Sequence, residues 1–156
     1  MSFRIERWNG QVGVAEQLAR WHVKEWQSVF PEWTVQDAVA EFNTQLLFSE
    51  LPATWLAFSD DVLIGSISAL LEDSAELNDI AGPWLASFYI VPDYRGKGVG
   101  QLLMAAVEQA VKSFGYQEWY LFTPHHEAYY AKQGWALKEN RRIHDANVAV
   151  MIQELN

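Results

Sequence analysis

The amino-acid sequence predicts a mixed α/β protein built around one sheet, with residues 1–156 forming a single domain. Segments of strand character alternate with segments whose apolar residues recur at helical spacing, which favours helices packed on a sheet. The length of 156 residues suits one domain, and half of the residues are apolar, as in ordinary globular proteins.

The N-terminal part is predicted to hold one strand followed by two helices. Residues 3–8 alternate loosely between apolar and polar side chains, as a strand does. Apolar residues at helical spacing predict a helix within residues 12–30. Thr34 is suited to cap a second helix over residues 35–47, because its hydroxyl can accept a backbone N–H of the first turn.

A hairpin and a central strand are predicted next. Residues 54–59 and 62–71 have the pattern of two strands joined by the turn Asp60-Asp61. The acidic, turn-rich residues 72–83 predict a loop. Residues 84–91 are too apolar for a half-exposed strand, so we expect them to be buried on both faces.

The C-terminal half gives clearer signals. Residues 98–114 carry apolar side chains at the i, i+3, i+4 spacing of an amphipathic helix, and residues 118–122 predict a strand. Thr123-Pro124 indicates an N-cap followed by proline at the first helical position, which predicts a short helix to about residue 133. The chain closes with strands, the last over residues 146–155.

Composition excludes several classes of function. The net charge of −9 argues against a nucleic-acid partner, which needs a basic face. The absence of Cys excludes a disulfide scaffold, a thiolate metal site and a cysteine nucleophile, and the scattered His residues indicate no metal site. No apolar run reaches the roughly 18 residues of a membrane span, and the first residues lack the apolar region of a secretory signal. We therefore expect a cytoplasmic protein without a membrane partner.

Acidic residues are concentrated in one stretch of the chain. Between Lys24 and Arg95 there is no Lys or Arg, and the stretch holds these acids: Glu25, Glu32, Asp37, Glu41, Glu50, Asp60, Asp61, Glu72, Asp73, Glu76, Asp79 and Asp93. One interpretation is a solvated acidic surface that keeps the protein soluble. The other is a cleft wall that attracts a cation.

One turn carries the signature of an anion site. Three alternating glycines interrupt residues 91–103, where a strand runs into a helix: Gly96, Gly98 and Gly100. Glycines allow positive φ and close approach of the backbone to a ligand, and N–H groups at a helix N-terminus bind anions. Arg95 and Lys97 add positive charge, so the segment predicts a phosphate or pyrophosphate site; the alternative is a tight turn that binds nothing. The spacing matches neither the P-loop nor the dinucleotide-binding fingerprint.

Two motifs in register identify a family resemblance. Arg95-x-x-Gly98-x-Gly100, after a strand ending in Ile90-Val91-Pro92, resembles the acetyl-CoA-binding motif of the GNAT superfamily of N-acetyltransferases. The segment Ala128 to Trp135 resembles that family's A-x-Y-x-x-x-G-[FW] motif. The resemblance implies a central, mostly antiparallel sheet, splayed at its middle strand and flanked by helices on both faces. It also implies acetyl-CoA as co-substrate, while the spacing of the residues themselves indicates no metal.

The resemblance further implies which residues contact the co-substrate. The pantetheine arm would pair with the middle strand, and backbone N–H groups of the glycine turn would hold the pyrophosphate. The implied contacts are Phe88, Tyr89, Ile90, Arg95, Gly96, Lys97, Gly98, Val99, Gly100, Gln101, Thr123, Ala128 and Tyr130. Thr123 stands where the family frequently has Asn, and Tyr130 falls where the family often places a general acid.

The chemistry of amine acetylation assigns further roles. An alkyl amine with a pKa of roughly 10.4 must lose a proton before it attacks a thioester, and Glu72, Asp73 and Glu76 are candidate bases. The N–H of Ile90 is expected to stabilise the oxyanion. Tyr130 would protonate the leaving thiolate; the alternative for Tyr130 is a packing aromatic.

The sequence thus predicts an N-acetyltransferase that acts by direct attack in a ternary complex. The acceptor is expected to be a cationic primary amine: a polyamine-like or aminoglycoside-like small molecule, or a basic peptide terminus. The alternative is a non-catalytic module that senses acyl-CoA. A homodimer paired through an edge strand is compatible with either. Trp21, Trp26, Phe30 and Trp33 are expected mostly in the core, with one or two lining the acceptor cleft.

Overall fold

The computed structural model describes residues 2–155 and contains seven strands and four α-helices in one mixed sheet fold. The helices are α1 (Val14–Trp26), α2 (Val35–Thr44), α3 (Val99–Ser113) and α4 (Glu127–Lys132). The strands are β1 (Arg4–Arg7), β2 (Ala53–Ser59), β3 (Val62–Leu70), β4 (Trp84–Ile90), β5 (Glu118–Thr123), β6 (Ala136–Ile143) and β7 (Ala146–Glu154). Short 3₁₀ turns lie at Gln45–Leu47, Ala75–Leu77 and Pro92–Tyr94. Among the described residues, no helix has the length and apolarity to cross a membrane.

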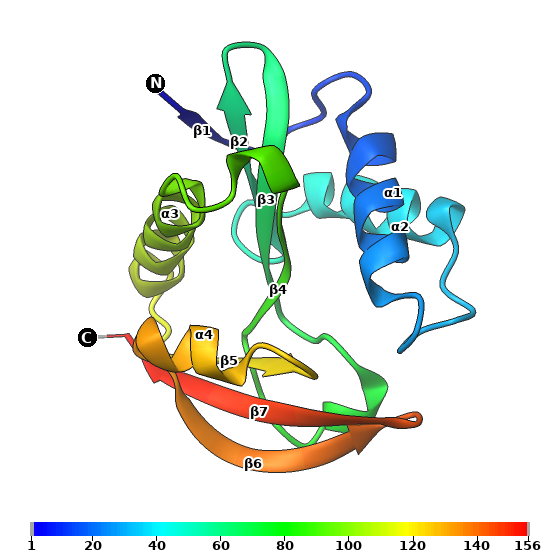
Figure 1. Cartoon of the computed structure of the whole chain (residues 1–156), viewed down its shortest axis with the longest axis vertical. Coiled ribbons are helices and arrows are strands. Elements are labelled where there is room, and N and C mark those ends of the chain that lie inside the picture. The colour runs from blue at the N-terminus through cyan, green and yellow to red at the C-terminus, as the bar shows by residue number, and fades with distance from the viewer. Residues whose placement is uncertain (1, 156) are drawn as a thin grey trace.

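The sheet separates at its centre, as predicted. Its order is β1-β2-β3-β4-β5-β7-β6, and every neighbouring pair is antiparallel except β4 and β5. These two parallel strands pair at one position, Trp84 with Tyr120. Beyond that pair they diverge, and the strands β5, β7 and β6 cross beneath the first four (Figure 1). The gap leaves one edge of β4 without a partner strand.

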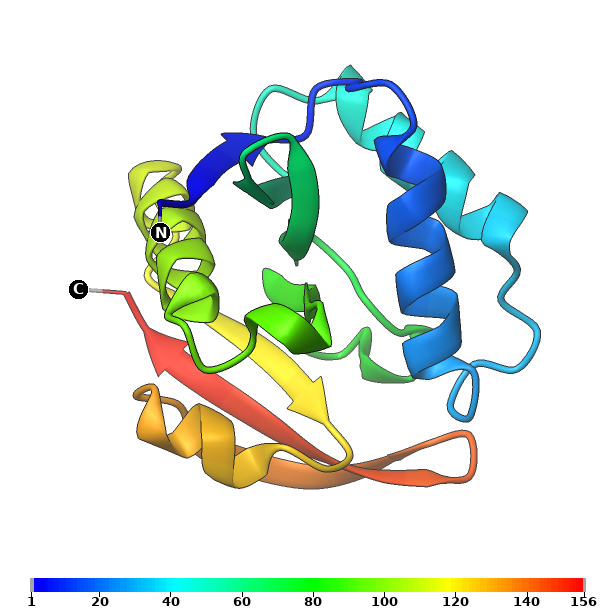
Figure 2. The ribbon, with the colours of Figure 1, turned by 45° about the horizontal axis from the view of Figure 1, so that its top comes forward.

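Helices cover both faces of the sheet (Figure 2). On one face α3 buries Leu103 and Val107 against β2 and β3. On the other face Leu18 of α1 and Phe42 of α2 pack on Leu56 of β2. The predicted cap of α2 is confirmed: Thr34 Oγ1 accepts the N–H of Asp37 at 3.1 Å, and the Asp37 carboxylate accepts the N–H of Thr34. This reciprocal pair satisfies two N–H groups of the first helical turn.

The middle strand differs from its prediction. We expected residues 84–91 to be buried on both faces, but only Trp84 and Leu85 are, and residues 86–90 are half-buried. The reason is the departure of β5, which opens the strand to a cleft. At the same place Ser87 has φ of 53°, and the β3–β4 register shifts between Ser66 and Ser68. This bulge bends β4 where the sheet opens.

Two other details differ from the prediction. Thr123 is the last residue of β5 rather than the N-cap of α4, and its hydroxyl accepts the N–H of His126 at 3.0 Å across a turn. The helix begins only at Glu127, with His126 at its N-cap. Pro124 therefore lies in this turn. The sequence predicts closing strands but no bounds for the strand over residues 136–143. The reason is that its charged sequence shows little alternation of apolar and polar side chains.

Candidate active site

Two cavities join at the opening of the sheet. The smaller, of about 680 Å³, lies between β4, the glycine turn and α4. The larger, of about 880 Å³, lies between the end of α1, α2, the loop after β3 and β5. Four residues line both: Glu25, Phe88, His126 and Tyr130. They define a junction where a group bound in one cavity meets a group bound in the other.

The glycine turn has the geometry that its sequence predicts for an anion site. Gly96 and Gly98 have φ of 76° and 87°, in the left-handed region that glycine favours. Helix α3 begins after Gly98 without a side-chain cap, so no side chain covers its first N–H groups. A Cβ on Gly100 would lie 3.1 Å from Phe88 Cζ and 3.4 Å from the hydroxyl of Tyr129. A side chain at this position would therefore crowd this wall of the smaller cavity.

Arg95 supports the end of the middle strand. Its Nε donates a 2.8 Å hydrogen bond to the carbonyl oxygen of Ile90, and its guanidinium lies 5.4 Å from the ring centre of Tyr89. Lys97 places its Nζ 5.6 Å from the ring centre of Tyr94. Arg95 therefore orients β4, and both cations lie beside the turn.

The N–H of Ile90 faces the gap in the sheet. Val91 donates its N–H to the carbonyl of Ile64 at 2.9 Å, and Gly65 stands opposite Ile90 in the register. Because hydrogen-bonded and non-hydrogen-bonded pairs alternate along antiparallel strands, Ile90 belongs to a non-hydrogen-bonded pair. Its N–H and C=O point away from β3, toward the side where β5 has separated.

Tyr130 stands at the junction within a group of aromatic rings. Its ring centre lies 6.5 Å from Phe88 and 5.2 Å from Tyr129. Burial, with a smaller contribution from Tyr129, raises the pKa of Tyr130 above its usual range. Its hydroxyl is therefore protonated at neutral pH and can serve as a proton donor.

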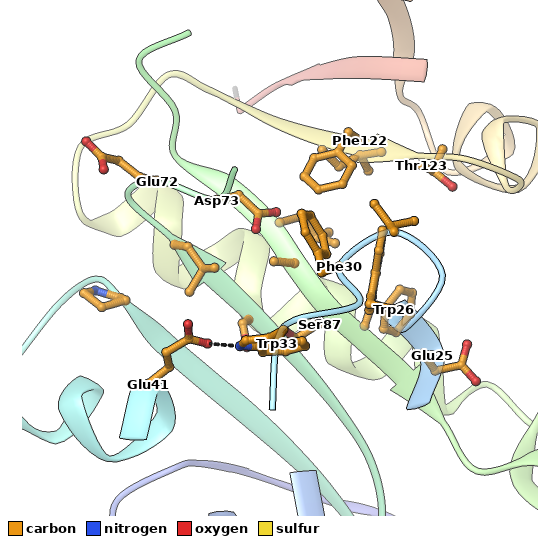
Figure 3. Close-up of a pocket in the computed structure, with 18 of the residues that line it drawn as sticks. Glu25, Trp26, Phe30, Trp33, Glu41, Glu72, Asp73, Ser87, Phe122 and Thr123 are labelled. Carbon is orange, nitrogen blue, oxygen red and sulfur yellow. Dashed lines mark hydrogen bonds between the residues drawn. The ribbon is translucent and has the colours of Figure 1, made fainter. Parts of the chain in front are cut away.

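The larger cavity combines aromatic walls with carboxylates (Figure 3). Trp26 and Phe30 meet Phe122 with ring centres 5.4 and 6.5 Å away. Trp33 Nε1 donates a 3.1 Å hydrogen bond to Glu41 Oε2, which fixes that carboxylate at the wall. None of the described residues that line this cavity is Lys or Arg.

Asp73 is the most perturbed carboxyl of this cavity. It is exposed to the cavity rather than packed into the core. The surrounding walls nevertheless desolvate its carboxyl, and this desolvation, together with the nearby charge of Glu41, raises the pKa of Asp73 to about 7. Burial also raises the pKa of Glu41, while the Trp33 hydrogen bond opposes that shift.

Comparison with known proteins places these features in a family. The model of the acetyltransferase (GNAT) family matches residues 15–135, which include all of α1 but its first residue, and the glycine turn. The chain belongs to the GNAT acetyltransferase family. Curated protein sequences, by contrast, give no match to this chain.

Solved GNAT structures share the fold at low sequence identity. A GNAT acetyltransferase from Streptococcus pneumoniae is 16% identical in sequence and has a TM-score of 0.69. The match covers 99% of this chain and 100% of that protein. An aminoglycoside 6'-N-acetyltransferase complexed with coenzyme A is 17% identical, with a TM-score of 0.73 and coverage of 98% and 97%. The PaiA N-acetyltransferase from Thermoplasma acidophilum, in complex with coenzyme A, is 20% identical, with a TM-score of 0.65 and 99% of both chains covered.

Most of the residues that the GNAT motifs implicate line the smaller cavity. These are Phe88, Tyr89, Ile90, Arg95, Gly96, Gly98, Gly100, Gln101 and Tyr130. Thr123 lines the larger cavity, whereas Lys97, Val99 and Ala128 are not among the described lining residues of either, and Val99 is buried in the core. The expectation that the four aromatic residues near the N-terminus lie mostly in the core was wrong, because none of them is fully buried. Trp26, Phe30 and Trp33 line the larger cavity, while Trp21 packs on Tyr89 with ring centres 5.0 Å apart.

The three candidate bases do not lie at the same place in the structure. Glu72 and Asp73 line the larger cavity. Glu76 faces elsewhere: its carboxylate accepts a hydrogen bond from Ser74 and lies 3.8 Å from His144 Nε2. Sequence reasoning missed two junction residues as site candidates, Glu25 and His126. The continuous acidic stretch contains Glu25, but only the folded chain shows that the end of α1 and the start of α4 line the same cavities.

Proposed function

We propose that this protein transfers the acetyl group of acetyl-CoA to a primary amine of a cationic small molecule or peptide, by direct attack within a ternary complex. The observation that carries the proposal is the junction of two cavities at Tyr130 and Phe88. One cavity is bounded by the glycine turn, and the other presents carboxylates among aromatic rings. Two substrates can therefore bind from opposite sides and meet at one point.

The residues of the smaller cavity suit acetyl-CoA. The uncapped N-terminus of α3 and the positive φ of Gly96 and Gly98 present backbone N–H groups to a pyrophosphate. The free edge of β4 offers N–H and C=O groups to the amide-rich pantetheine arm. When bound, acetyl-CoA supplies an acetyl group activated as a thioester.

Groups of this chain supply the proton transfers and the charge stabilisation. The N–H of Ile90 points into the gap and is assigned to donate to the developing oxyanion. The protonated hydroxyl of Tyr130 holds the proton for the departing thiolate. Glu25 is the carboxylate that lines both cavities, so it is assigned to accept the amine proton, directly or through a water. Glu72 and Asp73 line only the larger cavity, where they attract the cation.

Release of free CoA thiol with a panel of amines tests the proposal. Cationic amines should release thiol faster than neutral or acidic ones, and the advantage should shrink at high salt because exposed charges are screened. Binding of acetyl-CoA without acetyl transfer to any amine would instead support the acyl-CoA-sensing alternative. A preference for acidic amines would contradict the assigned role of the carboxylates.

A further inference from the structure

We infer that the acceptor is a small diamine: one primary amine reacts at the junction, an apolar spacer lies along aromatic rings, and a second cationic group binds between Asp73 and Glu41. The inference rests on the proposed function and narrows its substrate class. It depends on where the carboxylates of the larger cavity lie relative to the junction, and on what separates them.

The carboxylates occupy two separate ends of the larger cavity. Glu25 also lines the smaller cavity, so it marks the end where the acetyl group arrives. Glu41 and Asp73 line the larger cavity alone. Figure 3 shows Glu25 and Thr123 on one side of the rings of Trp26 and Phe30, and Glu41 on the other side. An acceptor with a single amine, bound so that this amine reacts beside Glu25, therefore leaves Glu41 and Asp73 without a cation.

Aromatic rings line the larger cavity between the two ends. Trp26 and Phe30 have ring centres 6.0 Å apart, and both rings meet Phe122 edge-on. Such a wall buries methylene groups and also attracts a cation that lies over a ring face. Of these three side chains only the indole N–H of Trp26 can form a hydrogen bond, so this part of the wall gives little to a chain of hydroxyl groups. A hydrocarbon spacer fits this wall better than a hydroxylated sugar.

Asp73 lines the larger cavity without a counter-charge. Among the described residues, no hydrogen bond or ion pair reaches its side chain, and none of those lining the cavity is Lys or Arg. Glu41 close by adds a second negative group, whose position the Trp33 hydrogen bond fixes. A cation that the ligand supplies pairs with both carboxyls, and this pairing favours the ionised form of Asp73, which is partly protonated near pH 7 without it.

The inference favours a small molecule over a peptide. The cavity of about 880 Å³ has room for an entire drug-sized ligand, and its two acidic ends lie inside that volume. A basic peptide would instead place most of its chain outside the cavity. A preference for peptides over diamines is therefore one of the outcomes that would overturn the inference.

The test compares straight-chain α,ω-diaminoalkanes of increasing length with n-alkylamines of the same carbon number, by kcat/KM with acetyl-CoA. We expect the best diamine to exceed its matched monoamine by about tenfold or more, since one hydrogen bond to a charged group contributes a factor of that order. We also expect an optimum at one chain length, because the two ends of the cavity are fixed.

Two variants locate the second charge. Asp73→Asn and Glu41→Gln should each reduce the ratio of diamine to monoamine kcat/KM toward one while the variant still binds CoA. Asp61→Asn, an exposed turn residue changed in the same way, should keep the wild-type ratio. Equal rates for diamines and monoamines, or an unchanged ratio in both cavity variants, would overturn the inference while leaving amine acetylation intact. Failure to acetylate any amine would overturn both the inference and the proposed function.

Discussion

His22 Nε2 lies 3.0 Å from the hydroxyl oxygen of Ser66, which in turn donates a 3.3 Å hydrogen bond to the carbonyl of Ser87. This short chain of hydrogen bonds connects α1, through β3, to the residue of β4 that carries the positive φ. His22 and Ser66 are both buried. The bulge that opens the sheet is thus anchored from the helix that also carries Glu25.

Ser66→Ala tests this anchor. The change leaves the imidazole of His22 without its partner in a buried site, which should lower the free energy of unfolding by about 1–3 kcal/mol. Urea denaturation measures the loss. Ser113→Ala, which removes an exposed hydroxyl at the end of α3, should change stability by no more than about 0.5 kcal/mol. Equal losses in the two variants would show that the buried chain has no special role.

The pH dependence of stability should carry a contribution from His22. Burial lowers the pKa of His22 from 6.5 to about 3, so the unfolded chain takes up the proton first as pH falls. Above pH 6.5 His22 is neutral in both states, and the free energy of unfolding does not depend on it. Between pH 6.5 and about 3 only the unfolded chain binds the proton, so the free energy of unfolding falls by about 1.4 kcal/mol per pH unit. Asp73 acts in the opposite direction, because its raised pKa makes the folded state bind its proton first as pH falls below about 7.

A His22→Gln variant separates the two groups, since its amide retains a hydrogen-bonding side chain but does not titrate. We expect the stability of the wild type to fall more steeply than that of the variant below pH 6.5. Urea denaturation at a series of pH values measures the free energy of unfolding of both proteins. If the two free energies change in parallel with pH, His22 is not buried in the neutral form.

The glycine turn should be intolerant of a β-branched side chain. Gly100→Val places atoms 3.1 Å from Phe88 and into the smaller cavity, so acetyl-CoA should bind about ten- to a hundredfold more weakly by calorimetry. Ala105→Val, on an exposed position of the same helix, controls for the β-branched side chain. Arg95→Ala should weaken binding less, by about 1–2 kcal/mol, as for one exposed charge-assisted contact. Unchanged affinity in Gly100→Val would remove this turn from the binding site.

Tyr130→Phe should lower kcat with little change in KM for acetyl-CoA. A proton donor acts in the transition state, whereas ground-state binding comes from the backbone, so the loss should be on the order of 10²–10⁴-fold in kcat. Tyr116→Phe, at a residue that is not among the described lining residues of either cavity, serves as the matched control. A Phe variant with wild-type turnover would leave Tyr130 with a packing role only.

Patterns of nearby residues predicted the elements that are stabilised by contacts between residues close together in the sequence. The cap at Thr34 and the apolar stripe of α3 depend on neighbours a few residues apart, and both form as expected. The half-burial of β4 could not be predicted, because it depends on β5 leaving the sheet after a single pair, Trp84 with Tyr120.

The same distinction applies to the site. Consecutive residues form the glycine turn, so its sequence motif was sufficient to find most of the smaller cavity. The junction instead brings Glu25 from the end of α1 to Tyr130 on α4. No local pattern marks Glu25 among the other acids of its stretch, since its role depends on the packing of α1 across the opened sheet.

The most direct test follows an isotopically labelled acetyl group from acetyl-CoA, by mass spectrometry of the amine and of the protein in the same reaction. We predict labelled N-acetylated amine in equal amount to the free CoA released, no labelled protein intermediate, and product formation slowed by about a hundredfold or more in Tyr130→Phe. Labelled acetyl on the protein that forms without amine, or acetyl-CoA that binds and stays intact with every amine tried, would contradict direct transfer at the junction of the two cavities.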